Sequence, residues 1–206
     1  MALLEGKRAL ITGLASNRSI AWGIAKAMQR EGAEIALTYQ NEKLKPRVEK
    51  FAEELGSNLA LPCDVGDDSA IDELFRTLSG HWDVLDIVVH SIAYAPRAEL
   101  EGLYLDAVTR QGFITAHEIS SYSFAALARG AQELMRGRNG ALLTLTYIGS
   151  LRSMPGNNVM GLAKASLATN VRYLAPLLRA EGVPGNGISA GPLSATAPQG
   201  ICRHRD

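Results

Sequence analysis

The segment Lys7-Arg-Ala-Leu-Ile-Thr-Gly-Leu-Ala-Ser-Asn-Arg-Ser-Ile-Ala-Trp-Gly23 indicates the fold class of this chain. Residues 7–12 are typical of a buried strand, and 19–30 have the apolar spacing of an amphipathic helix. Gly13 lies between them, where the backbone has to turn tightly. A glycine turn that opens a helix presents free N–H groups and a positive dipole end to a diphosphate. The spacing is not G-x-G-x-x-G, so a simple turn without a ligand remains a second interpretation.

Strands and helices alternate along the rest of the chain. Leu85 to His90 is an almost uninterrupted apolar run, which is typical of a strand buried on both faces of a parallel sheet. The alternation predicts an α/β, Rossmann-like, doubly wound parallel sheet in a single domain over residues 1–206. Further strands are expected at 33–38, 59–61, 141–146 and 187–190, and helices at 41–54 with Asn41 as N-cap, 67–79, 107–135 in two pieces, and 158–178.

Composition narrows the classes of function. The 206 residues include 21 basic and 21 acidic side chains, a balance that gives no support for nucleic-acid binding. No apolar run approaches the roughly 18 residues that span a bilayer, and the N-terminus lacks the pattern of a signal peptide. We therefore expect a cytoplasmic protein that does not bind membranes. Cys63 and Cys202 lack metal-ligand spacing and are expected to be free thiols, with no metal site.

Polar residues follow the predicted strands. Gln40 follows the second strand, where a residue that contacts the ribose is expected, and no arginine comes directly after it to pair with a 2′-phosphate. This favours NADH over NADPH. Asp64, Asp67 and Asp68 allow a metal site, but capping of the following helix by Asp67 and Asp68 is the better interpretation. His90, at the end of a buried strand, is expected to be a hydrogen-bonded structural residue rather than a base.

Residues 157–176, beginning Asn-Asn-Val-Met-Gly-Leu-Ala-Lys-Ala-Ser, resemble the catalytic helix of the bacterial NADH-dependent enoyl-acyl carrier protein reductases, a divergent branch of the short-chain dehydrogenase/reductase family. The likeness covers residues 1 to about 201. It includes Ser19-Ile20-Ala21 in the first turn, Tyr39-Gln40-Asn41 and Cys63-Asp64-Val65 after the second and third strands, and the run from His90 to Pro96 after the fourth.

The resemblance implies hydride transfer from NADH to the double bond of a trans-2-enoyl thioester in fatty-acid elongation. The implied partners are an acyl carrier protein that carries the enoyl chain and other copies of the chain, since the intact family forms tetramers. The implied substrate contact is Ala95. The implied cofactor contacts are Gly13, Ser19, Ile20, Gln40, Asp64, Val65, Ser91, Ile92, Lys164, Gly191 and Leu193.

The resemblance also implies catalytic roles for Tyr147 and Lys164. Asn157 stands where the family has a second tyrosine, seven residues before the lysine and therefore on the same helical face. An asparagine amide donates a hydrogen bond but does not deliver a proton near neutral pH. We therefore expect impaired activity.

The sequence also departs from the family pattern at its C-terminal end. The sixth strand is interrupted by glycine and proline, the Arg-Thr pair after Gly191-Pro-Leu193 is replaced, and the seventh strand and the C-terminal segment are expected to be absent. A non-catalytic NAD-binding remnant of the family is the alternative function. A 3-oxoacyl reductase is disfavoured, because Met160 occupies the position of its tyrosine.

Overall fold

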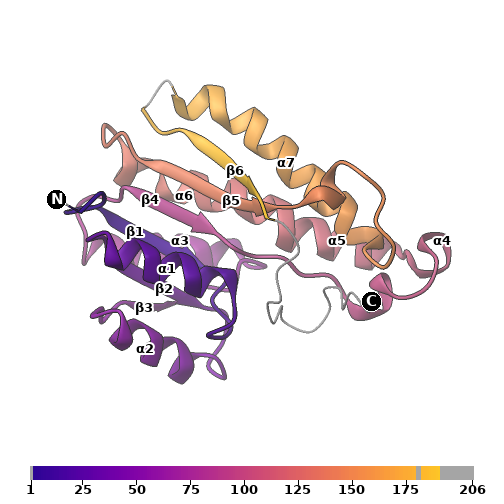
Figure 1. Cartoon of the computed structure of the whole chain (residues 1–206), viewed down its shortest axis with the longest axis horizontal. Coiled ribbons are helices and arrows are strands. Elements are labelled where there is room, and N and C mark those ends of the chain that lie inside the picture. Colours follow the sequence, from indigo (N-terminus) through magenta and orange to yellow (C-terminus); the bar gives the residue numbers. More distant parts are fainter. Residues whose placement is uncertain (1, 180–181, 191–206) are drawn as a thin grey trace.

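One parallel sheet forms the centre of the molecule (Figure 1). The computed structural model describes residues 2–179 and 182–190. Within these residues the sheet has six strands in the order β3-β2-β1-β4-β5-β6, all parallel to their neighbours. The order reverses direction between β1 and β4, which confirms the doubly wound arrangement. The strands are β1 Arg8–Thr12, β2 Glu34–Tyr39, β3 Ala60–Pro62, β4 Ile87–His90, β5 Ala141–Thr146 and β6 Gly185–Ser189.

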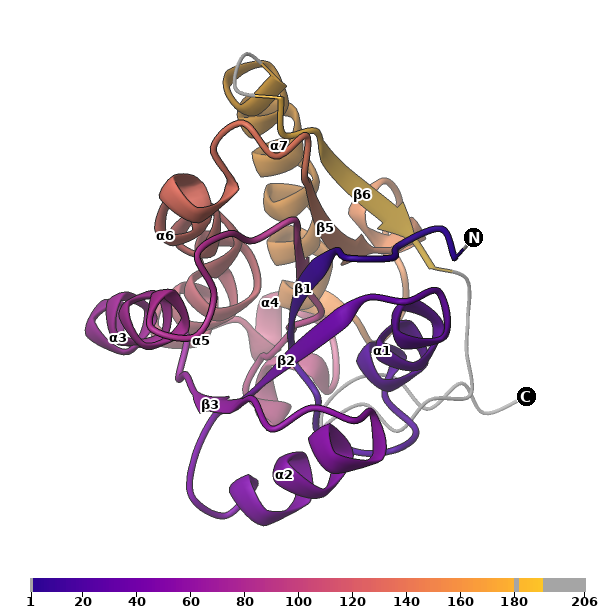
Figure 2. The ribbon, with the colours of Figure 1, turned by 90° about the vertical axis from the view of Figure 1, so that its left-hand side faces the viewer.

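Helices cover both faces of the sheet (Figure 2). On one face lie α1 (Ile20–Arg30) and α2 (Lys45–Glu54), and on the other α3 (Asp68–Ser79), α6 (Ser123–Met135) and α7 (Asn158–Arg179). The remaining helical elements are η1 Arg97–Leu100, α4 Tyr104–Ala107, α5 Arg110–His117, the π-helical turn η2 Glu118–Tyr122, and η3 Ile148–Ser150. Within the described ranges, no helix has the length and hydropathy needed to cross a bilayer.

Successive residues of each strand pack into two separate hydrophobic cores, one on each face of the sheet. In β1, Leu10 packs with α3 and α6, whereas Ala9 and Ile11 pack with α1 and α2. In β4, Val88 packs in the core with Leu10, and Val89 packs in the core with Ala9 and Ile11. All of these side chains are fully buried, so the period of two along each strand, combined with burial on both faces, produces the uninterrupted apolar runs of the sequence.

Most predicted elements are confirmed to within two residues, but the N-cap at Asn41 was wrong. Helix α2 begins at Lys45, with Leu44 in the N-cap position and no side-chain cap. Pro46 lies in the first turn, where its fixed φ favours a helix start. Asn41 instead accepts a hydrogen bond from the Leu44 amide through Oδ1 (3.2 Å), which closes the preceding turn.

Two other boundaries differ from expectation. The stretch 107–135 contains two helices, but a π-helical turn joins α5 to α6 without a loop. Strand β6 starts at Gly185, two residues before the expected 187, because its backbone pairs with β5 from Leu142 to Thr146 in spite of its glycines. The ladder is a backbone property and forms even where side chains contribute little burial.

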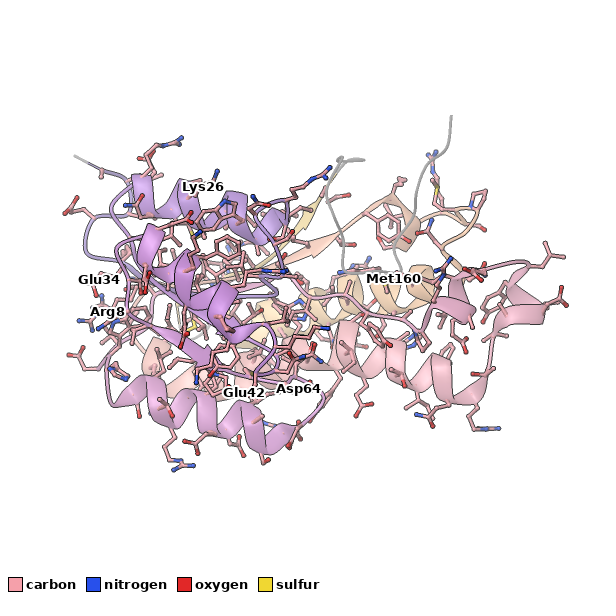
Figure 3. The ribbon with its side chains drawn as sticks, turned by 90° about the horizontal axis from the view of Figure 1, so that it is seen from below. Arg8, Lys26, Glu34, Glu42, Asp64 and Met160 are labelled. Atoms are coloured by element: carbon pink, nitrogen blue, oxygen red, sulfur yellow. The ribbon has the colours of Figure 1, made fainter. Side chains whose placement is uncertain are left out.

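Labelled side chains mark the two ends of the sheet (Figure 3). Arg8 and Glu34 lie at one end and are joined by a hydrogen bond from Nε to Oε2 (3.4 Å). Asp64 and Met160 lie toward the other, where the strands have their carboxyl ends. A small third core, built from Ala95, Leu100, Ala116, Val159, Met160 and Ala163, packs the segment after β4 against α5 and α7 at this second end.

Candidate active site

Gly13 forms the tight turn between β1 and α1. Its φ is +83°, and a Cβ atom at this position would overlap the backbone carbonyl of Ser91. The chain therefore needs glycine here for two independent reasons, conformation and space. The turn brings the carboxyl ends of β1 and β4 together at the reversal of strand order, which is where open α/β sheets bind ligands.

The loop between Gly13 and α1 is held at both ends. The Ser19 hydroxyl caps α1 by accepting from the Trp22 amide (3.3 Å) and donates to the carbonyl of Ser16 (2.7 Å). Arg47, on α2, donates from Nη1 to the carbonyl of Ala15 (2.9 Å). Nothing in the sequence pattern indicated Arg47, because no spacing rule links residues 32 positions apart on different elements.

Gln40 and Asp64 lie together after β2 and β3. Gln40 donates from Nε2 to Asp64 Oδ2 (3.3 Å), and Asp64 Oδ1 accepts from the Gly66 amide (3.0 Å). Val65 is buried in the core beside α3, so its backbone rather than its side chain is available to a cofactor. As expected, Asp67 caps α3 by accepting from the Ser69 amide (2.9 Å). The part of the chain that the structure describes contains no group of three metal-ligating side chains.

Lys164 is buried on α7 and points at the ends of two strands. Its Nζ donates to the carbonyl of Leu145 (2.7 Å) in β5 and to that of Ile92 (3.4 Å) just after β4. Burial lowers its pKa from 10.5 to about 8. A lysine of this kind carries most of its charge at neutral pH in a place where that charge is weakly solvated, so it interacts strongly with any ligand that develops negative charge nearby.

Tyr147 packs its ring against two glycines. A Cβ on Gly149 would overlap the tyrosine ring, and a Cβ on Gly161 would lie 4.0 Å from the tyrosine hydroxyl and 3.2 Å from the carbonyl of Gly149. Gly161 stands three residues before Lys164 on α7, so the phenol lies against the helix that carries the lysine. A glycine inside a helical pattern is the sequence signal for this close approach.

Asn157 lies immediately before α7 rather than on it. Its side chain is buried, and Nδ2 donates to the carbonyl of Pro155 (3.3 Å). Its own carbonyl accepts from the Met160 amide (2.8 Å) and its amide donates to Met154 (3.2 Å). The flanking Gly156 and Asn158 both have positive φ, at 70° and 37°. Asn157 is therefore part of a tight turn that opens the helix.

Of the remaining predicted residues, three lie in the described part of the chain and three lie outside it. Ser91 lies against Gly13 as described, whereas the Ala95 side chain is buried in the third core. Ile20 is the first residue of α1. Gly191, Leu193 and Cys202 lie outside the described residues.

His90 and Cys63 serve the structure. Both ring nitrogens of His90 are hydrogen-bonded, Nδ1 to Thr144 Oγ1 and Nε2 to Ser123 Oγ, each at 2.8 Å. This agrees with the expected structural role. Burial, reinforced by the charge of Lys164, lowers the pKa of His90 from 6.5 to about 3, so the ring stays neutral. Cys63 is a free, buried thiol whose pKa burial raises to about 12, which makes it unreactive.

This sheet order, with a glycine turn at the reversal point and a buried lysine beside the strand ends, defines a dinucleotide-binding protein of the short-chain reductase class. The family model described as Enoyl-(Acyl carrier protein) reductase matches residues 13–206. The chain belongs to this family.

Comparison with individual proteins leads to the same family. The chain is 56% identical over 201 residues to the enoyl-[acyl-carrier-protein] reductase [NADH] FabI of Salmonella typhimurium and 55% identical to that of Escherichia coli, in both cases covering 98% of this chain and 76% of the relative. The crystal structure of the Aquifex aeolicus enoyl-[acyl-carrier-protein] reductase (NADH) superposes with a TM-score of 0.93 at 52% identity, covering 95% of this chain and 76% of the other. That of the Anaplasma phagocytophilum enzyme, in complex with NAD, gives 0.90 at 44% identity, covering 97% and 75%.

Proposed function

We propose that this chain is an NADH-dependent enoyl-acyl carrier protein reductase, which reduces the double bond of a trans-2-enoyl thioester. The observation that carries the proposal is the placement of Lys164: a buried ammonium group hydrogen-bonded to the end of β5 and to the segment after β4, with the Tyr147 phenol against the same helix. The names of the relatives supply the substrate and the cofactor.

The residues present fit a dinucleotide. Gly13 lacks the Cβ that would fill the space beside Ser91, and the capped N-terminus of α1 follows directly, which suits a diphosphate. Gln40 and Asp64 offer neutral and acidic groups for the adenosine end. Lys164 offers a cation for the nicotinamide ribose, and NADH, when bound, supplies the hydride.

Reduction of the thioester-conjugated double bond builds negative charge on the thioester oxygen. Tyr147 provides a hydroxyl donor for this oxygen, and the positive charge of Lys164 stabilises the developing anion in a poorly solvated environment. Completing the reaction also requires a proton for the α-carbon. The amide of Asn157 cannot supply that proton, so we propose that the step depends on Tyr147 or on water and is slow.

A non-catalytic, NAD-binding role is the second candidate, and the position of Asn157 favours it. The side-chain amide at this point of the site is buried and donates to the carbonyl of Pro155 in its own turn. An amide engaged in this way contributes to the helix entrance and contributes less to a substrate oxygen.

Binding and turnover separate the two candidates. NADH binding is measured by fluorescence titration, and turnover by loss of NADH absorbance with crotonyl and longer enoyl thioesters. Reductase function predicts binding together with a slow, thioester-dependent loss of NADH that Lys164→Met abolishes. Binding without any thioester-dependent loss supports the second candidate, and the absence of NADH binding contradicts both.

Cofactor choice follows from the end of β2. Gln40 donates to Asp64, and a carboxylate at this position disfavours a 2′-phosphate by charge repulsion. We expect NADH to bind more tightly than NADPH in parallel titrations. Asp64→Asn is expected to narrow the difference, and a preference for NADPH in the unmodified chain would contradict this assignment.

The proposal also covers the location of the reaction, the carrier of the substrate and the oligomeric form. We place the reaction in the cytoplasm, with acyl carrier protein as the substrate carrier and a homo-oligomer as the working form. The description of the matching family names the acyl carrier protein.

A further inference from the structure

The π-helical turn η2 and the first residue of α6 carry three buried serines. Ser120 and Ser121 lie in the turn, Ser123 opens α6 directly after it, and all three are buried. Apolar side chains of similar size would pack there without the cost of burying hydroxyl groups. π-helical turns are rare and occur often at functional sites. The hydrogen-bond partners of these three hydroxyls connect the turn with the surroundings of Lys164.

The first serine holds the segment after β4. Ser120 Oγ accepts from the Tyr94 amide (2.9 Å) and donates to the Tyr94 carbonyl (3.0 Å). This segment also contains Ile92, whose carbonyl accepts a hydrogen bond from Lys164. One hydroxyl therefore fixes both backbone groups of a residue close to an acceptor of the lysine.

The third serine holds the ends of two strands. Ser123 Oγ is hydrogen-bonded to His90 Nε2 (2.8 Å), and His90 Nδ1 in turn to Thr144 Oγ1 (2.8 Å). His90 ends β4 and Thr144 lies in β5, one residue before Leu145. Leu145 provides the second carbonyl acceptor of Lys164. Ser120 in the π-helical turn and Ser123 directly after it thus hold the backbone around both acceptors.

The second serine holds the helix that carries the lysine. The hydroxyls of Ser121 and Ser166 are 2.8 Å apart, and Asn170 Nδ2 donates to the carbonyl of Ser121 (3.1 Å) and to its hydroxyl (3.0 Å). Because Ser121 Oγ accepts from Asn170, its proton is available to Ser166. Ser166 and Asn170 lie two and six residues after Lys164 on α7, so these bonds fix both the rotation and the position of the helix next to the lysine.

We propose that the Ser121–Ser166–Asn170 cluster is a positioning element that sets α7 so that the Lys164 ammonium meets the carbonyls of Leu145 and Ile92. The helix and its two acceptors are then held by one short stretch of chain, residues 120–123. Ser121 holds the helix, and Ser120 and Ser123 hold the backbone near the acceptors. A shift of α7 by one residue would rotate Lys164 by about 100° and remove it from both carbonyls. The consequence for cofactor binding rests on the proposed function, but the placement of the lysine does not.

The direct test observes Lys164 itself. Its ε-carbon is followed by NMR over a pH titration of the full chain, with the resonance assigned by its loss in Lys164→Arg. Ser121→Ala should let α7 relax and Lys164 become hydrated, so its apparent pKa should rise from about 8 to about 9 or higher. Ser166→Ala makes the same test from α7 and serves if Ser121→Ala does not fold.

Tyr122→Phe is the matched control. It removes a hydroxyl from the same π-helical turn, but that hydroxyl bonds Asp68 at the start of α3 (2.8 Å) and not α7. The control should leave the lysine titration unchanged. A titration that is the same in Ser121→Ala and Ser166→Ala as in the unmodified chain, or that moves equally in Tyr122→Phe, would overturn the proposal.

A double-mutant cycle on NADH affinity then connects the cluster with the site. Ser121→Ala removes the hydroxyl that bonds Ser166 and Asn170 and should weaken NADH binding roughly 3- to 10-fold in the unmodified background. In the Lys164→Met background the same change should have no further effect, because the cluster acts through the lysine. An equal loss in both backgrounds would contradict this route. If the unmodified chain binds no NADH while the lysine titration still responds to Ser121→Ala, the proposed function fails and the positioning role stands.

Discussion

Strands β4 and β6 lie on either side of β5, yet they are built from opposite kinds of residue. In β4, Ile87-Val-Val-His90, every residue is buried, and the strand pairs with β1 and β5. In β6, Gly185-Asn-Gly-Ile-Ser189, no residue is fully buried, and within the described residues the strand pairs with β5 alone. The first strand is fixed by side-chain packing on both faces, whereas the second depends on its backbone ladder and on α7.

This difference separates two functional parts of the sheet. The proposed dinucleotide site uses the ends of β1 to β4, where the apolar core defines the geometry. Of the proposed catalytic residues, Tyr147 follows β5 and Lys164 lies on α7, next to the weakly packed strand. Substitutions on the two sides of β5 should therefore have very different effects.

The largest effect is expected at Gly13. Gly13→Ala introduces a Cβ that overlaps the Ser91 carbonyl at a φ of +83°, so it should destabilise the protein by about 4 kcal/mol in urea unfolding and abolish NADH binding. Gly23→Ala is the control, because that helical glycine has open space around its Cβ position, and the change should be neutral or stabilising. A loss below about 1 kcal/mol for Gly13→Ala would contradict the close packing of β1 against β4.

The next effect concerns Lys164, at the junction of the two parts. Its folded-state pKa of about 8 lies below the unfolded value of 10.5, so the unfolded chain binds more protons between these pH values. Stability relative to Lys164→Met should therefore rise by about 3 kcal/mol as the pH increases from about 8 to 10.5, and should stay constant below about 7. Unfolding curves of both proteins across this range provide the measurement. If the free energies of unfolding of the two proteins changed equally with pH, the lysine would be hydrated in the folded protein.

The third effect concerns Asn157. Asn157→Tyr is expected to raise thioester-dependent turnover roughly 10-fold, which is less than the roughly 10²–10³ associated with one oxyanion donor. The gain should be partial, because Asn157 is buried in a tight turn that has to adapt to the larger ring. Asn157→Phe, which has the same shape without the hydroxyl, should give no gain. If it gave the same gain, the phenol would not be the cause.

The smallest effect is expected in β6. A Cβ at Gly187 would lie 3.7 Å from Val171 and 3.8 Å from Thr146, which are ordinary van der Waals distances. Gly187→Ala should therefore stabilise the protein by about 0.5–1 kcal/mol, since it restricts the unfolded chain and adds contact to the strand. Thermal unfolding at equal protein concentration tests this expectation. Destabilisation by Gly187→Ala would mean that β6 is packed more tightly than its exposed side chains indicate.

The fold was largely predictable because its strands carry strong patterns. The apolar run that ends at His90 predicted a strand buried on both faces, and helix α3 began where Asp67 predicted a cap. The N-cap at Asn41 failed because Pro46, five residues later, set the helix start instead. The early start of β6 was missed because glycine and proline hide a strand whose pairing comes from its neighbour.

The residues of the proposed site could be named from the sequence, but their contacts could not. Lys164 and Tyr147 were identified from residue order and family likeness, yet nothing in their spacing indicated that the lysine bonds the carbonyls of Leu145 and Ile92. Gly161 and Arg47 were missed because their roles depend on elements that are distant in sequence. The serines of the π-helical turn were missed for the same reason.

The sequence by itself determined the class of fold, the family and the identity of the residues at the strand ends, because periodicity and residue order are local properties of the chain. Only the tertiary structure decided which of these residues meet. It packed Gly13 against the Ser91 carbonyl and brought the Tyr147 hydroxyl close to Gly161. It also buried Lys164 and thereby lowered the pKa of this lysine. Burial and hydrogen-bond partners depend on how helices pack across the sheet, and that packing joins residues whose separation along the chain carries no signal.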